Sequence, residues 1–168
     1  MSVNEKLILT NDQVIQVIKR IAYEIYEHNF QEPEIFLVGI EGQGVVLAKK
    51  ISEQLAEIAP DLKHQVVALS IDKENPHSKK ATIGVPSEVL KEKSMILVDD
   101  VLNSGRTLAY GLNVLMGTNV KRIQTAALVD RSHKKFPVIA NFKGYELSTT
   151  LEQHIEVRLE NNPGIFLY

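Results

Sequence analysis

The residues best suited to chemistry in this chain are two adjacent carboxylates, Asp99 and Asp100, which follow an apolar run. The segment after them carries a glycine between two hydroxyl groups, those of Ser104 and Thr107, and then becomes apolar at helical spacing. Such a loop at the start of a helix presents backbone amides that can bind a phosphate. Carboxylates accept hydrogen bonds well from vicinal hydroxyl groups, such as those of a sugar. The segment therefore predicts a site for a ligand that carries both a sugar and a phosphate.

The glycine of this loop, Gly105, is expected to let the backbone approach the ligand closely. Other glycine-rich motifs fit the chain less well. The segment Gly39–Gly44 is not followed by the Gly-Lys-Ser/Thr of a Walker loop, and Gly42-Gln43-Gly44 lacks the third glycine of a dinucleotide fingerprint. A simpler alternative stays open, in which Asp99 and Asp100 only cap the next helix and the glycine only turns the chain.

Apolar runs that predict buried strands alternate with helical stretches along the chain. The strands are expected at Ile35–Ile40, Val66–Ile71, Met95–Val98, Ile123–Val129 and Phe142–Leu147. This alternation indicates an α/β fold with a parallel central sheet flanked by helices. Ligands bind beyond the carboxyl ends of the strands in such sheets, and the two aspartates directly follow the third strand.

Two further segments have clear local patterns. Thr10 and Gln13 fit a capping box, and the apolar residues after them recur at the spacing of an amphipathic helix. In the stretch 155–159, apolar residues alternate with charged ones, which predicts a C-terminal edge strand with one face in water.

Length and composition predict a single domain that covers residues 1–168. Hydrophobic residues make up 44% and charged residues 24%, which excludes a disordered chain. The formal net charge of -2 argues against a general polyanion binder, and the absence of cysteine excludes disulfides, thiolate catalysis and cysteine-bound zinc. No apolar run reaches the ~18 residues of a membrane span. We therefore expect a cytoplasmic protein without a membrane partner.

Three segments of the chain resemble a known family. The segment Val98–Thr107 resembles the 5-phosphoribosyl-1-diphosphate (PRPP) motif of type I phosphoribosyltransferases, with Ser104 where threonine is common. Leu37–Ile40 and Gly44–Lys49 resemble the pyrophosphate-loop region of that family. Ala127–Pro137 is similar to a stretch of one branch, the pyrimidine operon attenuation regulators with uracil phosphoribosyltransferase activity.

The resemblance implies both a fold and an activity. The fold would be a parallel five-stranded sheet flanked by helices, with a small hood. The activity would transfer the 5-phosphoribosyl group from PRPP to a nucleobase, with uracil as the best guess, and would release pyrophosphate. Mg²⁺ would be carried with PRPP, and a homodimer or higher homo-oligomer is expected. The alternative is a nucleotide-sensing, RNA-binding regulator of pyrimidine genes that uses the same pocket.

The resemblance also assigns roles to matching residues. Asp99 and Asp100 would hold the ribose hydroxyls and act in catalysis, and no residue is expected to be a metal ligand. The 5-phosphate, the pyrophosphate and the base would be bound by Val101, Leu102, Asn103, Ser104, Gly105, Arg106, Thr107, Glu41, Gly42, Gln43, Gly44, Asp130 and Arg131. Of these, Asp130 and Arg131 would lie on the base side. Glu41 and Gln43 occupy a loop in which the family usually has a basic residue.

Other basic residues are open to two interpretations. Lys73, Lys79 and Lys80 lie in a polar stretch that would form the lid of such an enzyme, where they either neutralise pyrophosphate or belong to an ordinary solvated loop. The turn His133–Lys135 either contacts RNA or phosphate, or is simply solvated. The histidines that we interpret as surface residues are His64 and His154.

Overall fold

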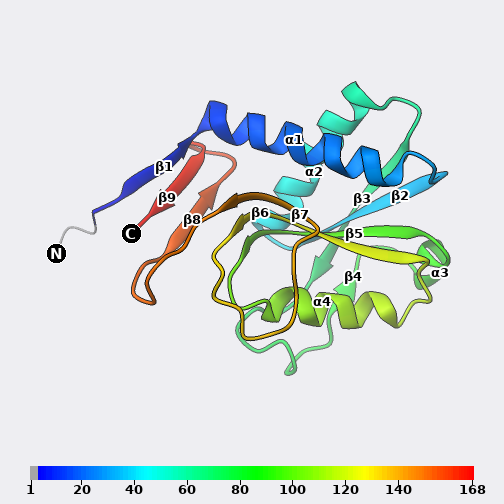
Figure 1. Ribbon diagram of the computed structural model, residues 1–168. Coiled ribbons are helices and arrows are strands. Elements are labelled where there is room, and N and C mark those ends of the chain that lie inside the picture. Colours follow the sequence, from blue (N-terminus) through cyan, green and yellow to red (C-terminus); the bar gives the residue numbers. More distant parts are fainter. Residues whose placement is uncertain (1–3) are drawn as a thin grey trace.

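The computed structural model describes residues 4–168, and its centre is a six-stranded sheet in the order β4-β3-β2-β5-β6-β7 (Figure 1). Its strands are β2 (Glu34–Ile40), β3 (Lys63–Ser70), β4 (Thr82–Ile83), β5 (Ser94–Leu102), β6 (Arg122–Asp130) and β7 (Phe142–Glu146). All of them except β4 run parallel to their neighbours, which confirms the five predicted strands. The additional strand, β4, pairs antiparallel with β3 over two residues. A strand this short leaves no apolar run from which it can be predicted.

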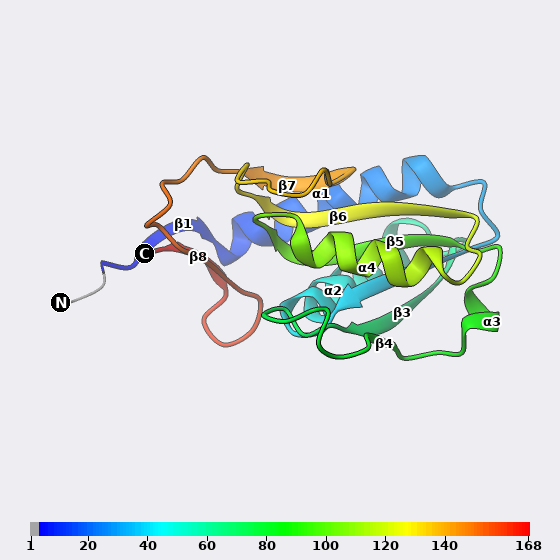
Figure 2. The ribbon, with the colours of Figure 1, turned by 90° about the horizontal axis from the view of Figure 1, so that it is seen from below.

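Helices cover both faces of this sheet (Figure 2). α1 (Asn11–Asn29) and α2 (Gln43–Ile58) pack on one face, α4 (Arg106–Met116) packs on the other, and the short α3 (Ser87–Leu90) precedes β5. The side chains of β2 alternate accordingly, because Ile35 and Leu37 are buried with α1 and α2, whereas Phe36 and Val38 are buried with α4. None of the helices between residues 4 and 168 combines the length and apolar character that a membrane crossing requires.

The start of α1 has the predicted capping box. The Thr10 hydroxyl accepts a hydrogen bond from the Gln13 amide at 3.4 Å, and the Gln13 side chain accepts one from the Thr10 amide at 2.9 Å. The apolar stripe that follows is buried against the sheet, from Val14 to Ile25. Local sequence therefore defines both the beginning and the buried face of this helix.

A second, three-stranded antiparallel sheet brings the two ends of the described chain together. It consists of β1 (Lys6–Thr10), β9 (Gly164–Leu167) and β8 (Ile155–Arg158), in that order (Figure 1). This sheet forms the expected hood. The predicted strand in the stretch 155–159 is present, but it borders the hood and not the central sheet. β1 and β9 have no counterpart in the prediction, because their pairing joins segments that are far apart in the sequence.

β5 continues beyond its predicted end. The apolar run stops at Val98, yet the ladder with β6 goes on through Asp99, which lies opposite Ala127, to Leu102, which lies opposite Asp130. The two aspartates therefore belong to the last part of a strand and do not lie in a loop after it. Membership of the sheet fixes their backbone more firmly than a loop would.

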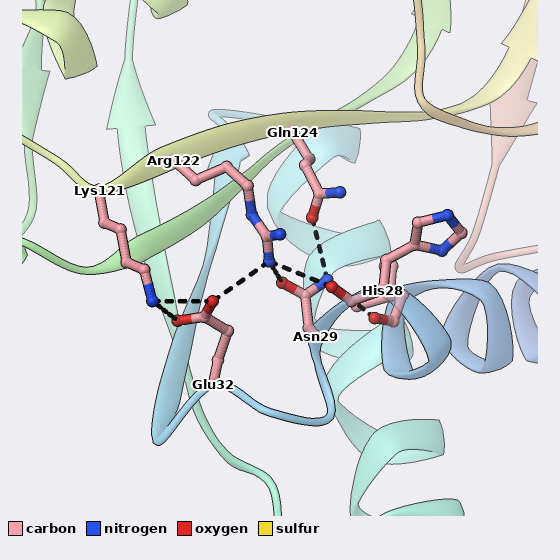
Figure 3. A network of polar contacts seen from close by, with 7 residues as sticks. His28, Asn29, Glu32, Lys121, Arg122 and Gln124 are labelled. Carbon is pink, nitrogen blue, oxygen red and sulfur yellow. Dashed lines mark hydrogen bonds and ion pairs between the residues drawn. The ribbon is translucent and has the colours of Figure 1, made fainter.

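A polar network ties the end of α1 to the opposite, amino end of β6 (Figure 3). The Arg122 guanidinium donates to the Asn29 side chain and to the His28 carbonyl, and the Asn29 amide donates to Gln124. Lys121 and Glu32 form an ion pair at 3.0 Å beside it. This network closes the end of the sheet that lies away from the predicted phosphate-binding segment.

Candidate active site

A cavity of about 600 Å³ lies where the end of β5, the start of α4 and the hood meet. The hood, which contributes part of its lining, lies on the side of the molecule toward which the carboxyl ends of the parallel strands point (Figure 1), the side where ligands bind in this class of sheet. Its lining residues are Gln43, Lys73, Asp99, Asp100, Val101, Leu102, Asn103, Ser104, Gly105, Arg106, Thr107, Leu108, His154, Ile155, Glu156, Val157, Arg158, Glu160 and Asn161. The whole predicted ribose and phosphate segment therefore faces one cavity.

Asp99 is the buried member of the carboxylate pair, with 3% of its surface exposed. Its Oδ1 accepts hydrogen bonds from the Asp100 amide at 3.0 Å and from the Lys73 ammonium at 3.3 Å. Burial, and next the neighbouring charge of Asp100, raise the pKa of Asp99 from 3.8 to about 7, while Lys73 acts in the opposite direction. A protonated carboxyl is therefore accessible here near neutral pH.

Asp100 is half-buried and also lines the cavity. A carboxylate there can accept hydrogen bonds from ligand hydroxyls that also reach Asp99. The alternative in which both aspartates only cap the next helix is wrong, since α4 is capped at Gly105 and has no side-chain cap hydrogen bond.

The start of α4 has the geometry that the predicted anion site requires. Ala109 donates a helical hydrogen bond to the Gly105 carbonyl at 2.9 Å, and the amides before it belong to the first turn, where amides lack helical acceptors. One of them, that of Arg106, donates to the Ser104 hydroxyl at 3.2 Å. Thr107, also in this first turn, lines the same cavity. This arrangement suits a phosphate, because it combines amide donors with the positive end of a helix dipole.

Gly105 is also required by the packing of the protein itself. Its φ of 82° lies in the left-handed region, which glycine adopts at no steric cost. A Cβ at this position would lie 3.3 Å from the Phe136 carbonyl oxygen and 3.5 Å from the Val138 Cβ. The close approach is thus to a neighbouring loop, which also bonds Ser104 through the amides of Lys135 and Phe136. Gly105 also lines the cavity, and its close approach to a ligand stays a prediction.

The segment Glu41–Gly44 is only partly at the cavity. Gln43 lines it, and its side-chain oxygen accepts a hydrogen bond from the Leu159 amide of the hood at 3.2 Å. Glu41 accepts instead from the Ser70 hydroxyl. Gly44 has a steric role, since a Cβ there would lie 2.9 Å from the Val98 carbonyl oxygen.

Asp130 and Arg131 lie beside the cavity and are not among the residues that line it. Asp130 accepts from the Ser132 amide at 2.9 Å and from the Lys134 ammonium at 3.2 Å. Arg131 is buried and donates to the side chains of Asn103 and Thr149 and to backbone carbonyls at residues 150 and 153. It therefore links the phosphate segment to the chain that leads into the hood.

The other basic residues considered as candidates lie in different places in the structure. Lys73 reaches the cavity, whereas Lys79 and Lys80 line another groove of about 550 Å³, over Tyr110 of α4. The His133–Lys135 turn is largely engaged within the protein, because the His133 ring contacts the Thr149 carbonyl at 2.7 Å and Lys134 pairs with Asp130.

Of the two histidines interpreted as surface residues, only His64 departs from that expectation. His64 is half-buried, and its ring nitrogens contact the carbonyls of Leu62 at 2.9 Å and Ser52 at 3.1 Å. His154 is exposed, as expected, but it lines the cavity.

The hood residues of the cavity have no counterpart in the predicted site. Glu156, Arg158 and Glu160 form the charged half of the alternating pattern, and the sequence assigns them to water. The alternating pattern marks this strand, but residues of both of its faces line the cavity, Ile155 and Val157 as well as Glu156 and Arg158.

Arg158 anchors this part of the hood. Its guanidinium pairs with Glu5 at 2.7 Å and with Glu156 at 2.9 Å, and it lies 4.2 Å from the centre of the Phe166 ring. Hydrogen bonds from Arg158 and Tyr168 hold the pKa of Glu156 at about 2, well below its usual range. The charge of Arg158 is therefore shared between two carboxylates.

Comparison with known proteins identifies the family. The family described as phosphoribosyl transferase domain matches residues 5–161. The chain belongs to the phosphoribosyltransferase family. Members of this family are pentosyltransferases of nucleotide metabolism that bind PRPP and a nucleobase and generally use Mg²⁺.

Relatives with similar sequences share the name bifunctional protein PyrR. The chain is 32% identical to the bifunctional protein PyrR of Fusobacterium nucleatum, over 98% of this chain and 96% of that protein. It is 34% identical to the bifunctional protein PyrR of Pediococcus pentosaceus, over 91% of each. Among solved structures, a hypoxanthine-guanine phosphoribosyltransferase of Bacillus anthracis has the same fold, with a TM-score of 0.78 and 19% identity over 97% of this chain and 98% of that one.

Proposed function

We propose that this phosphoribosyltransferase transfers the 5-phosphoribosyl group of PRPP to uracil and releases pyrophosphate. The observation that carries the proposal is the presence, in one cavity, of the Asp99–Asp100 pair and the first turn of α4. The carboxylates suit the ribose hydroxyls, and the amides suit the 5-phosphate. The hood closes the remaining side of the cavity, where the base would lie.

In the proposed reaction the bond between C1 of the ribose and the diphosphate oxygen breaks, and its electron pair leaves with pyrophosphate. A bond forms from C1 to a nitrogen of the base, and that nitrogen loses its proton. Positive charge develops on the ribose at the transition state, so an ionised carboxylate beside the ring stabilises it. Asp99 and Asp100 also orient the ring, because they are fixed by the β5 ladder.

The donor set suits Mg²⁺ carried by the substrate. Mg²⁺ is usually bound by one or two carboxylates together with substrate phosphates, and Asp99 and Asp100 supply such oxygens at the cavity. Among residues 4–168 no cluster of three or more potential ligands could hold a metal without the substrate. When bound, the ion would neutralise charge on the diphosphate.

Uracil is proposed as the acceptor because the nearly full-length relatives described above are bifunctional PyrR proteins at 32% and 34% identity. The same resemblance leads us to infer a homo-oligomer, which sedimentation velocity would test. It also suggests a second function, RNA binding. The basic turn offers little support for that function, because His133 and Lys134 already have partners within the protein.

The test is a pair of measurements on the purified protein. Calorimetry with PRPP and Mg²⁺ should detect binding that Asp100→Asn removes, while Lys121→Gln, at the far end of the sheet, serves as a matched control. Nucleotide formation from PRPP should be faster with uracil than with hypoxanthine. Failure of the folded wild-type protein to bind PRPP would overturn the proposal. Tight RNA binding with a steep salt dependence in a protein without turnover would favour the regulator instead.

A further inference from the structure

We propose that the hood selects an uncharged base, because Glu5 and Glu156 balance the charge of Arg158 and prevent it from pairing with an anionic one. This inference rests on the proposed function, in which the base lies at the hood, and it names the class of base that the cavity takes. Glu5 itself does not line the cavity. It is therefore a specificity-determining residue that acts through Arg158.

The first step of the argument is the charge that the hood presents to the cavity. Between residues 154 and 161, the lining side chains with a full charge are Glu156, Arg158 and Glu160. Glu5, which directly precedes β1, adds another carboxylate, because its Oε1 lies 2.7 Å from Nη2 of Arg158. Carboxylates thus outnumber the guanidinium on this side of the cavity, and like charge opposes an anionic ligand.

The second step is how firmly Arg158 is held. Its Nε donates to Glu156 Oε1 and its Nη2 to Glu156 Oε2, each at 2.9 Å, which is the paired geometry of a strong guanidinium–carboxylate contact. The Phe166 ring lies against the guanidinium. The Tyr168 hydroxyl contacts both Glu5 and Glu156 at 2.7 Å, so it holds the two carboxylates beside the same guanidinium.

The third step is the ionisation of the two carboxylates. Hydrogen bonds from Arg158 and Tyr168 hold the pKa of Glu156 at about 2. The hydrogen bond from Tyr168, and next that from Arg158, lower the pKa of Glu5 as well. Both carboxylates are therefore ionised near neutral pH, and the charge of Arg158 stays balanced in the conditions of binding.

The fourth step is what Arg158 still offers to a ligand. A guanidinium has five N–H donors, and the contacts described above use those of Nε and Nη2. The donors of Nη1 suit a carbonyl oxygen, which needs a hydrogen bond and no opposite charge. A carboxylate would need the positive charge that Glu5 and Glu156 already balance. The hood thus favours a neutral base that carries carbonyl groups.

The test compares three nucleotides that share ribose 5-phosphate. They are uridine 5-monophosphate, orotidine 5-monophosphate, whose base is uracil with an added carboxylate, and the carboxamide analogue of the latter. The carboxamide has nearly the size of the carboxylate but no charge. In calorimetry, the wild-type protein should bind the carboxamide at least about tenfold more tightly than the carboxylate.

Glu5→Gln should release the charge of Arg158. We expect the affinity for orotidine 5-monophosphate to rise at least about fivefold, while that for uridine 5-monophosphate stays within about twofold of the wild type. Glu156→Gln should act in the same direction. The gain should disappear in the double variant Glu5→Gln/Arg158→Gln, because the guanidinium that makes it is absent. A merely structural role of Glu5 would not raise the affinity for one ligand alone.

Two matched controls separate charge from other effects. Tyr168→Phe removes the hydroxyl that contacts both carboxylates but leaves their charge, so the ratio of the two affinities should stay within about twofold of the wild type. Glu57→Gln makes the same change of charge as Glu5→Gln at an exposed position near the end of α2, and it should leave all three affinities unchanged.

Two outcomes would overturn the inference. A carboxamide that binds no better than the carboxylate would mean that size and not charge excludes the larger base. An unchanged affinity for orotidine 5-monophosphate in both folded single variants, Glu5→Gln and Glu156→Gln, would mean that these carboxylates do not control Arg158. A wild-type protein that binds none of the three nucleotides would instead refute the proposed function, before any variant is compared.

Discussion

Asp99 is the single residue on which most of the site depends. It is buried, it lies beside a second carboxylate, and it bonds both the next amide and the ammonium of Lys73. A side chain at Gly44 would approach its Oδ1 to 3.3 Å, so the start of α2 also limits the space around it. A ligand that replaces water here meets an acceptor with a fixed position.

The raised pKa of Asp99 predicts a pH dependence of stability. The folded protein holds this proton more tightly than the unfolded chain, so between pH 3.8 and about 7 the folded state binds more protons. The contribution of Asp99 to the free energy of unfolding should therefore be largest below pH 3.8. It should fall as the pH rises from 3.8 to about 7. Asp99→Asn should remove the fall and stabilise the protein at pH 8, by on the order of 1–3 kcal/mol.

Urea denaturation at several pH values measures this effect. Asp61→Asn, an exposed carboxylate outside the cavity, is the control and should keep the wild-type profile. Parallel stability profiles for the wild type and Asp99→Asn would contradict the prediction.

A second prediction at this scale concerns Gly105. Its left-handed φ and the nearby Phe136 carbonyl both oppose a side chain, so Gly105→Val should lower the free energy of unfolding by ~2–4 kcal/mol and weaken ribose 5-phosphate binding strongly. Ser104→Ala loses a hydrogen bond worth ~1 kcal/mol and should be milder. Thermal unfolding and calorimetry compare the two variants, and similar losses in both would show that the backbone of Gly105 is not critical.

At the scale of the elements, Arg131 connects the segment after β5 with the chain that leads into β8. It follows β6 directly and bonds Asn103 of the phosphate segment at 3.0 Å and the Gln153 carbonyl, just before β8, at 2.7 Å. A single guanidinium with several donors can hold two segments in a fixed relation, which a lysine cannot reproduce.

We therefore expect Arg131→Lys to loosen both segments. The free energy of unfolding should fall by ~2–4 kcal/mol, because several buried charged hydrogen bonds are lost. PRPP affinity should fall even though Arg131 does not line the cavity. Hydrogen exchange should increase in residues 103–107 and 149–153 together. An increase confined to one segment would refute the proposed connection.

At the scale of the whole molecule, the two ends of the central sheet have different roles. The carboxyl end holds the cavity, and the amino end holds the network around Arg122 and Asn29 (Figure 3). Asn29 is 1% exposed, so its hydrogen bonds are shielded from water.

This separation predicts that stability and binding can be changed independently. Asn29→Ala should lower the free energy of unfolding by ~1–3 kcal/mol, since it removes the buried hydrogen bonds of Asn29 with Arg122 and Gln124. Affinity for PRPP, measured well below the unfolding temperature, should stay at the wild-type value. Lys121→Gln, which breaks a more exposed ion pair, should cost at most ~1 kcal/mol. A loss of PRPP affinity in folded Asn29→Ala would show that the two ends are coupled.

The sequence by itself determined the elements whose signals are local. The capping box at Thr10, the five apolar strands and the segment Val98–Thr107 each depend on residues that are close together in the chain. Helical periodicity, strand periodicity and turn chemistry operate over such distances. For this reason the fold class, the family and the segment that lines the cavity after β5 were all predictable.

Only the tertiary structure decided which side chains complete the cavity. The hood pairs Lys6 with Leu167, Gln43 bonds Leu159, and Lys73 meets Asp99 across separate strands. The orientation of Arg131 away from the cavity is likewise set by partners that precede and follow it by many residues. Such contacts form when the chain packs, and no local pattern encodes them. β8 illustrates the reason, because its alternation predicts one polar face and one apolar face, and only packing determines that residues of both faces line the cavity.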